Sequence, residues 1–140
     1  MITELIAQLN WLHVFVAALA YFMFGALWYS PLLFIKQWLQ LTNMNPDDPD
    51  AKKDMAKTMI TSFILLFIIT IGIALLQVQF MTTTLIAGLK LGLFVGVIFS
   101  TTAISINYVY TRKSLKLYLI DCGYQIIGCG IVGAILGAWS

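Results

Sequence analysis

Four long apolar stretches fill most of this chain, and short polar segments separate them. They cover residues 10–29, 58–78, 85–110 and 117–139. Each provides at least the roughly 20 apolar residues that a helix needs to cross a hydrocarbon core of about 30 Å. Including their polar flanks, helices are predicted at residues 10–30, 49–78, 84–110 and 117–139. The pattern indicates one all-α domain over residues 1–140, a polytopic membrane protein with four transmembrane helices in an antiparallel bundle.

The composition agrees with a membrane location. Hydrophobic residues make up 61% of the chain and charged residues 10%, whereas soluble domains contain about 25% charged residues. The formal net charge of +2 comes from lysines and arginines in the connections rather than from a basic patch. Nucleic-acid binding is therefore not expected.

The N-terminal region is predicted to be a retained helix rather than a cleaved signal peptide. The first ten residues contain Glu4 and no lysine or arginine, and the first apolar run continues to Pro31 without a small-residue cleavage signature.

The distribution of positive charge predicts the orientation in the membrane. Basic residues favour the cytoplasmic side. They occur in the first and third connections but not in the second connection or near the termini. These residues are Lys36, Lys52, Lys53 and Lys57 in the first, and Arg112, Lys113 and Lys116 in the third. We therefore expect a cytoplasmic loop at residues 31–48 and both termini outside.

Cysteine labelling tests this orientation. Cysteines placed at Lys53 and Arg112 should be shielded from an impermeant thiol reagent in intact cells, while one placed at Thr83 should react. Labelling at Lys53 from outside would overturn the orientation.

The first connection contains its own structural signals. Residues 32–41 are apolar but too short to span a membrane, so they either extend the first helix or lie along the inner surface. Asp48 followed by Pro49 is typical of a helix N-terminus, with the aspartate as cap. The second helix should therefore begin near Pro49.

Several local motifs resemble the DUF1761 family, most specifically Gly-x-x-Trp-Tyr-Ser-Pro. The matching positions are Asn10-Trp11, Gly25-Ala26-Leu27-Trp28-Tyr29-Ser30-Pro31, Phe34, Lys36, Trp38, Asn107-Tyr108, Arg112, Lys113-Ser114, Asp121 and Gly137-Ala138-Trp139. The resemblance covers nearly the whole chain. It implies a bacterial-type protein with four helices in the cytoplasmic (inner) membrane, and it assigns neither an activity nor any functional residue.

Glycines recur along the last two predicted helices. Gly88, Gly92 and Gly96 share one face of the third helix, which Ser100, Ala103 and Asn107 continue. The fourth helix has a second row, made up of Gly123, Gly130, Ala134 and Gly137. Small residues let membrane helices approach closely. The rows therefore pack the third and fourth helices together within one chain, or one of them forms a homo-oligomer contact.

A candidate polar site is predicted near the inner end of the bundle. Asp121 is the only acidic residue within the membrane stretches, and such residues are functional candidates. Other polar or aromatic groups are expected at its depth, namely Gln125, Asn107, Trp28, Tyr29 and Ser30. This site could bind a cation, a proton or a polar headgroup. Alternatively, Asp121 tethers helix ends by pairing with Arg112, Lys113 or Lys116.

The remaining polar residues suggest no reactive centre. Lys90 is interpreted as a boundary lysine, and His13 as a partner for a neighbouring helix. Cys122 and Cys129 are seven residues apart on one helix, too far to form a disulfide with each other. We expect no metal, cofactor or enzymatic activity, because no catalytic set can be assembled.

Two classes of function remain from the sequence. The first is an accessory or interaction subunit that packs through its glycine-rich helices, in a homo-oligomer or a larger membrane complex. The second is a small transport or permeation module for a cation, a proton or a small polar solute. Helix one lacks the membrane-embedded acid on which small multidrug-resistance transporters rely.

Overall fold

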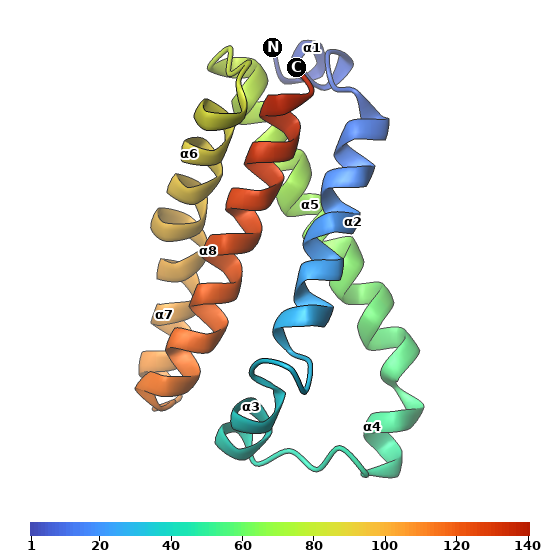
Figure 1. Ribbon diagram of the computed structural model, residues 1–140, viewed down its shortest axis with the longest axis vertical. Coiled ribbons are helices and arrows are strands. Elements are labelled where there is room, and N and C mark those ends of the chain that lie inside the picture. The colour runs from blue at the N-terminus through green and yellow to red at the C-terminus, as the bar shows by residue number, and fades with distance from the viewer.

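The computed structural model describes residues 1–140 and is entirely helical (Figure 1). The elements are α1 (Ile2–Ala7), α2 (Trp11–Trp28), α3 (Ile35–Thr42), α4 (Pro49–Lys53), α5 (Met55–Gln79), α6 (Leu85–Val95), the π-helical turn η1 (Gly96–Ser100), α7 (Thr101–Tyr110) and α8 (Leu115–Ala138). Four segments are long and apolar enough to cross a membrane, with α6, η1 and α7 counting as one. The predictions of an all-helical chain and of four helices long and apolar enough to span a membrane are confirmed.

The long helices lie side by side, and both termini are found at the same end of the molecule (Figure 1). We call this end, with α1, the terminal end, and the opposite end, with α3 and α4, the loop end. α8 is the central helix, since half of its span is buried, compared with 11% of the span formed by α6, η1 and α7. The core is built around Tyr21 of α2, Ile73 of α5 and Cys129 of α8.

Side-chain caps fix where several helices begin. The Asn10 side chain accepts hydrogen bonds from the backbone N–H groups of Leu12 and His13, at 3.1 and 3.3 Å. Thr84 and Ser114 cap α6 and α8 in the same way. These side chains satisfy backbone donors that have no partner within the helix.

The Asp48–Pro49 signal marks a helix start, as predicted. Asp48 accepts a hydrogen bond from the Asp50 N–H at 3.0 Å, and Pro49 occupies the first turn. The helix does not continue into the membrane, however. It ends at Lys53, because Asp54 leaves the helical conformation at φ −93° and ψ 5°, and α5 begins at Met55. The prediction of one helix over residues 49–78 is wrong at this point, where no glycine or proline signals the break.

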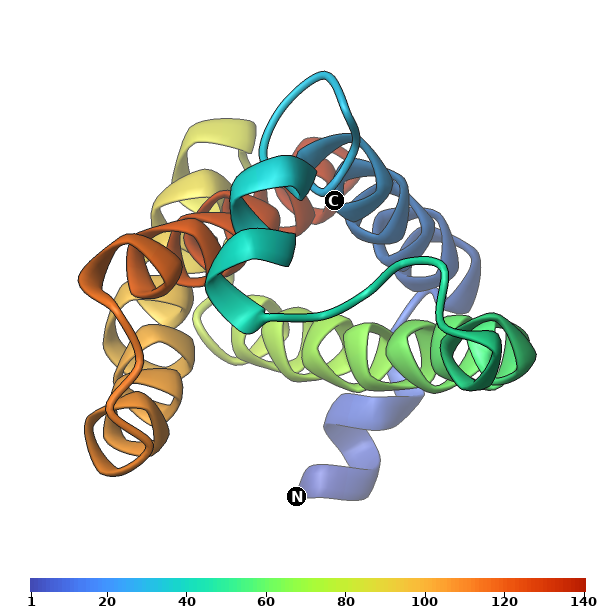
Figure 2. The same ribbon diagram turned by 90° about the horizontal axis from the view of Figure 1, so that it is seen from below.

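Residues 35–42 form a separate helix rather than an extension of α2. Ser30 produces the break, because its hydroxyl donates to the Leu27 carbonyl at 2.6 Å and accepts from the Leu32 N–H at 3.2 Å. α3 ends at Asn43, which adopts the left-handed conformation with φ 54°. Figure 2 looks onto the loop end and shows α3 lying across it, where it contacts α8. The sequence also did not predict α1.

A π-helical turn changes which face of the third span packs inward. η1 inserts one extra residue into the turn, which rotates all later side chains by about 100° relative to a continuous helix. Ala103 and Asn107 are consequently exposed, although the sequence pattern predicts that they continue the glycine face. Ser105 and Tyr108 are directed towards α8 instead, where they bond Tyr118 and Asp121.

The glycines of α6 and η1 bring the backbone of this span against that of α8 within the chain. A Cβ atom on Gly88 would overlap the carbonyl oxygen of Gly133, and one on Gly92 would overlap that of Cys129. A Cβ on Gly96 would lie 2.8 Å from the Ile126 Cα. No side chain other than hydrogen fits between the two backbones at these points.

The row predicted on α8 is only partly correct. Gly137 faces the Thr84 carbonyl, and Gly130 faces the Leu93 side chain. Gly123 lies away from α6 and faces the indole of Trp28 at 3.2 Å, while Gly133 contributes a contact that was not predicted. Residues 123 and 130 differ by only about 20° around the helix, so the difference lies in the neighbours: Trp28 of α2 covers this side of α8 near the loop end, and α6 covers it further along.

Candidate functional site

The Asp121 carboxylate joins the ends of three helices near the loop end. The Tyr29 hydroxyl, at the end of α2, donates to Oδ1 at 2.5 Å. The Tyr108 hydroxyl, on α7, donates to Oδ2. Each carboxylate oxygen therefore receives one phenol, and the bonds to a charged acceptor are stronger than those between neutral groups. Asp121 itself is half-buried.

Trp28 provides a further link between α2 and α8. Its indole N–H donates to the Ile120 carbonyl at 3.0 Å. Its ring also covers Gly123 and packs on Phe34, with ring centroids 4.6 Å apart. The absence of a side chain at Gly123 creates the space for this ring, so the glycine belongs to the polar site rather than to the contact with α6.

A second group of hydrogen bonds lies one turn further into the bundle. The Tyr21 hydroxyl donates to the Gln125 side-chain oxygen. It also lies 3.9 Å from the Cys129 sulfur, which is in turn 3.8 Å from the Ser100 hydroxyl on η1. Gly128 leaves room for the Tyr21 ring against α8. These contacts connect α2, η1 and α8 at the centre of the molecule.

Aromatic rings pack around one of the two phenols that bind Asp121. Tyr29 packs edge-on against Tyr124 and against Trp38 of α3, with centroids 5.4 and 5.9 Å apart. α3 therefore holds the phenol that binds Asp121. The arrangement makes a hydrogen-bonded junction, in which the two phenols take up two of the roughly four acceptor sites of the carboxylate.

The structure brings together four of the six predicted site residues. Asp121, Gln125, Trp28 and Tyr29 lie in this region. Asn107 is exposed because of the π-helical turn, and no hydrogen bond of its side chain is formed within the chain. Ser30 serves the local turn instead, as described above.

The predicted partners Arg112, Lys113 and Lys116 form no ion pair with Asp121. The ion pairs in the structure join Met1 with Glu4 and Lys52 with Asp47, both at exposed positions. A tether exists, but phenols replace the expected cations. Tyr29 is among the predicted site residues and Tyr108 is not, and only the positions of their hydroxyls show that both bind the carboxylate.

Other predicted features lie outside the site. His13 stacks on Trp139 at the terminal end, with ring centroids 4.3 Å apart. Lys90 is exposed and unpaired. Cys122 and Cys129 are buried free thiols. No group of three or more histidine, cysteine or acidic residues could hold a metal ion.

The comparison with protein families gives one match. Residues 12–137 match the family described as "Protein of unknown function (DUF1761)". The chain belongs to the DUF1761 family. No curated protein and no solved structure matches it. Membership of DUF1761 agrees with a membrane protein of four apolar helices, and it transfers no reaction, ligand or partner to Asp121.

Proposed function

We propose that this DUF1761 protein is an accessory or interaction subunit of the bacterial cytoplasmic membrane and not an enzyme. In this proposal the four spanning helices form an antiparallel bundle with both termini outside. The basic connections, which lie at the loop end with α3 and α4, then face the cytoplasm.

The main support for this proposal is the hydrogen bonding of the Asp121 side chain. Both oxygens of the only acidic side chain in the spanning helices are occupied by phenols of the same chain. Gln125 is likewise bonded by Tyr21. Polar groups that form all their hydrogen bonds with one another hold the helices that carry them in fixed positions. This arrangement supports a structural role for the polar site.

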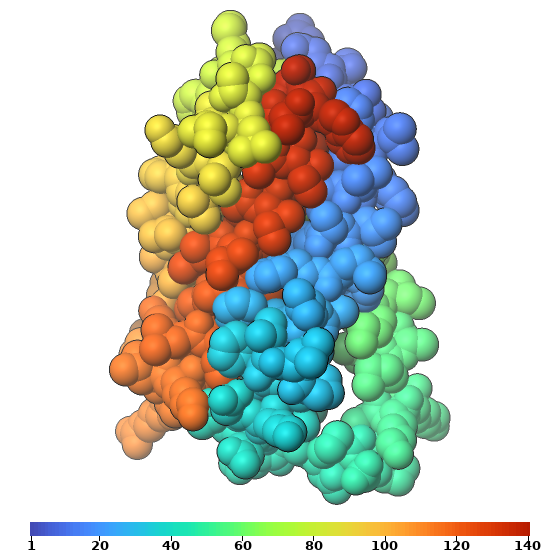
Figure 3. Space-filling view, in the orientation of Figure 1, coloured from blue at the N-terminus to red at the C-terminus, as the bar shows by residue number.

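The loop-end part of α5 offers a surface for a partner. Every residue from 55 to 61 is exposed, including Met55, Met59 and Ile60. The space-filling view shows the molecule hollowed between α3 and this part of α5 (Figure 3). An apolar helix that leaves its bundle in this way gains van der Waals contacts from a transmembrane segment of another protein.

Photo-crosslinking in native membranes tests the accessory role. We expect a photoreactive amino acid at Met59 to form a discrete product with another membrane protein, because this side chain is exposed on the part of α5 that lies away from the other long helices. The matched control is Phe94, which is also exposed but lies on α6. It should give no such product.

Two readouts decide the result. The product at Met59 should be identified by mass spectrometry as the same protein in independent preparations, and it should co-purify with the wild-type chain in mild detergent. Identical products at Met59 and Phe94, or none at either position, would contradict the accessory role.

A transport role is the second candidate, and the depth of Asp121 favours it. A single carboxylate in a membrane-spanning helix costs free energy unless it serves a function or is fully hydrogen-bonded. On this alternative, protein reconstituted in liposomes carries a proton or cation flux that the Asp121→Asn substitution removes. Absence of flux from the wild-type protein under both kinds of gradient would exclude it.

A further inference from the structure

One face of α5 carries a regular row of outward-facing residues. The steps along the helix are four, three, four, three and four positions, about 3.6 residues on average, the period of one face of an α-helix. The row consists of Thr61, Leu65, Ile68, Gly72, Leu75 and Gln79. All are exposed except Leu75, which is half-buried. A row with this spacing stays on one side of the helix, where a second helix can pack along its length.

Gly72 is the member of the row that most clearly indicates a missing partner. A Cβ atom added to it would meet nothing within 4 Å, whereas each of the other nine glycines has a close neighbour there. A glycine inside a helix costs about 0.5–1 kcal/mol relative to alanine. Within this chain nothing offsets that cost. In membranes, a bare backbone of this kind permits close approach of a second helix.

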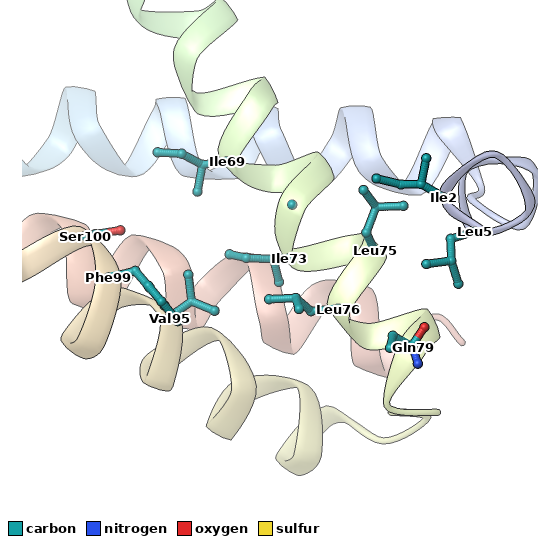
Figure 4. Close-up of a pocket in the computed structure, with 11 residues that line it drawn as sticks. Ile2, Leu5, Ile69, Ile73, Leu75, Leu76, Gln79, Val95, Phe99 and Ser100 are labelled. Atoms are coloured by element: carbon teal, nitrogen blue, oxygen red, sulfur yellow. The ribbon is translucent and has the colours of Figure 1, made fainter. Parts of the chain in front are cut away.

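An apolar groove of about 650 Å³ runs alongside Gly72 (Figure 4). Ile69, Ile73 and Leu76 of α5 form one wall. Val95 and Phe99 of the third span form the other, and Ile2 and Leu5 of α1 line the end nearest the terminal end. Figure 2 also shows α1 extending outward beyond α5. A helix placed on the row would therefore contact three elements.

We propose that the occupant is the α5 helix of a second copy of this chain. Two copies inserted in the same orientation are related by an axis along the membrane normal, so each residue of the row meets its own counterpart. Gly72 then faces Gly72 at the crossing. Gln79, whose side chain forms no hydrogen bond within the chain, faces Gln79.

Gln79 favours a second copy of this chain over another protein, because two Gln79 side chains can hydrogen-bond to each other. A primary amide both donates and accepts, so two identical amides satisfy each other, as two lysines or two carboxylates could not. Thr61 has the same property at the other end of the row. The dimer does not use the glycines of α6 and α8, which are already occupied within the chain. It is also independent of the accessory role, since it requires no other protein.

Association of the purified protein in liposomes tests the proposal. Two populations labelled with donor and acceptor dyes should show energy transfer that falls as lipid is added and the protein is diluted. The Gly72→Leu substitution should weaken association at least tenfold, because leucine blocks the crossing. Ala87→Leu, at an exposed position on α6, should associate like the wild type.

Thermal unfolding of the dispersed monomer in detergent separates loss of association from loss of the fold. Gly72→Leu should unfold at or above the wild-type temperature, since its side chain meets no atom and leucine favours the helix. Unchanged energy transfer in Gly72→Leu would overturn the dimer. So would an absence of energy transfer in the wild type, which would leave lipid or another protein as the occupant of the groove.

Disulfide trapping checks the geometry in whole membranes. Cysteines placed at Leu65 or Ile68 should form dimers on oxidation. A cysteine at Met59, which is also exposed but points about 160° away from the row at 100° per residue, should not. Equal trapping at all three positions would show random collision and contradict the proposed face.

Discussion

Gly92→Leu should destabilise the protein by about 3 kcal/mol or more, the upper end of what overpacking costs. A Cβ at this position overlaps the Cys129 carbonyl oxygen, and the Gly130 Cα lies only 3.1 Å away. Both neighbours are backbone atoms of the central helix, so no side-chain rotation can relieve the clash. The span formed by α6 and η1 must move away from α8. Unfolding in mixed detergent micelles, followed by circular dichroism, measures the loss.

Lys90→Leu provides the matched control for Gly92→Leu. Lys90 is on the same helix, is exposed and has no ionic partner, so the change should stay within about 0.5 kcal/mol of the wild type. If both variants unfolded alike, close backbone contact would not hold these helices together. If Gly92→Leu were as stable as the wild type, the α6–α8 contact described above would be wrong.

Asp121→Leu should destabilise the protein by about 2 kcal/mol, because it leaves the half-buried Tyr29 and Tyr108 hydroxyls without an acceptor, at roughly 1 kcal/mol each, the lower end of the cost of an unpaired group. Adding Tyr29→Phe and Tyr108→Phe should recover at least about 1 kcal/mol of this loss, since partners removed together leave no unpaired donor. Asp121→Asn retains an acceptor oxygen and should lose less than Asp121→Leu. The same unfolding assay measures all of these variants.

The recovery in the triple variant distinguishes phenol partners from the cationic partners predicted from the sequence. If Arg112, Lys113 or Lys116 held Asp121, removing the two hydroxyls would not restore stability to Asp121→Leu. Strictly additive losses across the three substitutions would therefore contradict the phenol junction. Arg112→Gln is a useful control, because no ion pair to Asp121 is formed and its effect should be small.

Much of the fold could be predicted because the relevant signals are local. The helix start at Pro49 depends on Asp48 and a fixed backbone angle, both adjacent in the chain. The break after Trp28 was marked by Ser30 and Pro31. The end of α4 at Lys53 and the short helix α1 had no comparable signal, since their residues are compatible with helix and coil alike.

The candidate site was predicted less completely, because it depends on contacts between distant helices. Asp121 stands out in any hydropathy pattern as a carboxylate in an apolar helix. Its partners were predicted only in part: Tyr29 is among the predicted site residues but Tyr108 is not, since a tyrosine near a membrane boundary also fits the aromatic belt. Tyr108 reaches the carboxylate only because η1 adds one residue to a turn. A continuous helix with 100° per residue instead predicts Asn107 on the face that carries the glycines.

The sequence alone determined that this chain has four helices able to span a membrane, because hydrocarbon requires every backbone group to bond within its own segment and apolar length decides which segments can do so. Family membership followed from local motifs as well. Only the tertiary structure decided which polar groups meet. Helix packing sets rotation about each axis, so it directed Tyr29 and Tyr108 to Asp121, occupied the glycines of α6 and α8 within the chain, and left Gly72 facing outward.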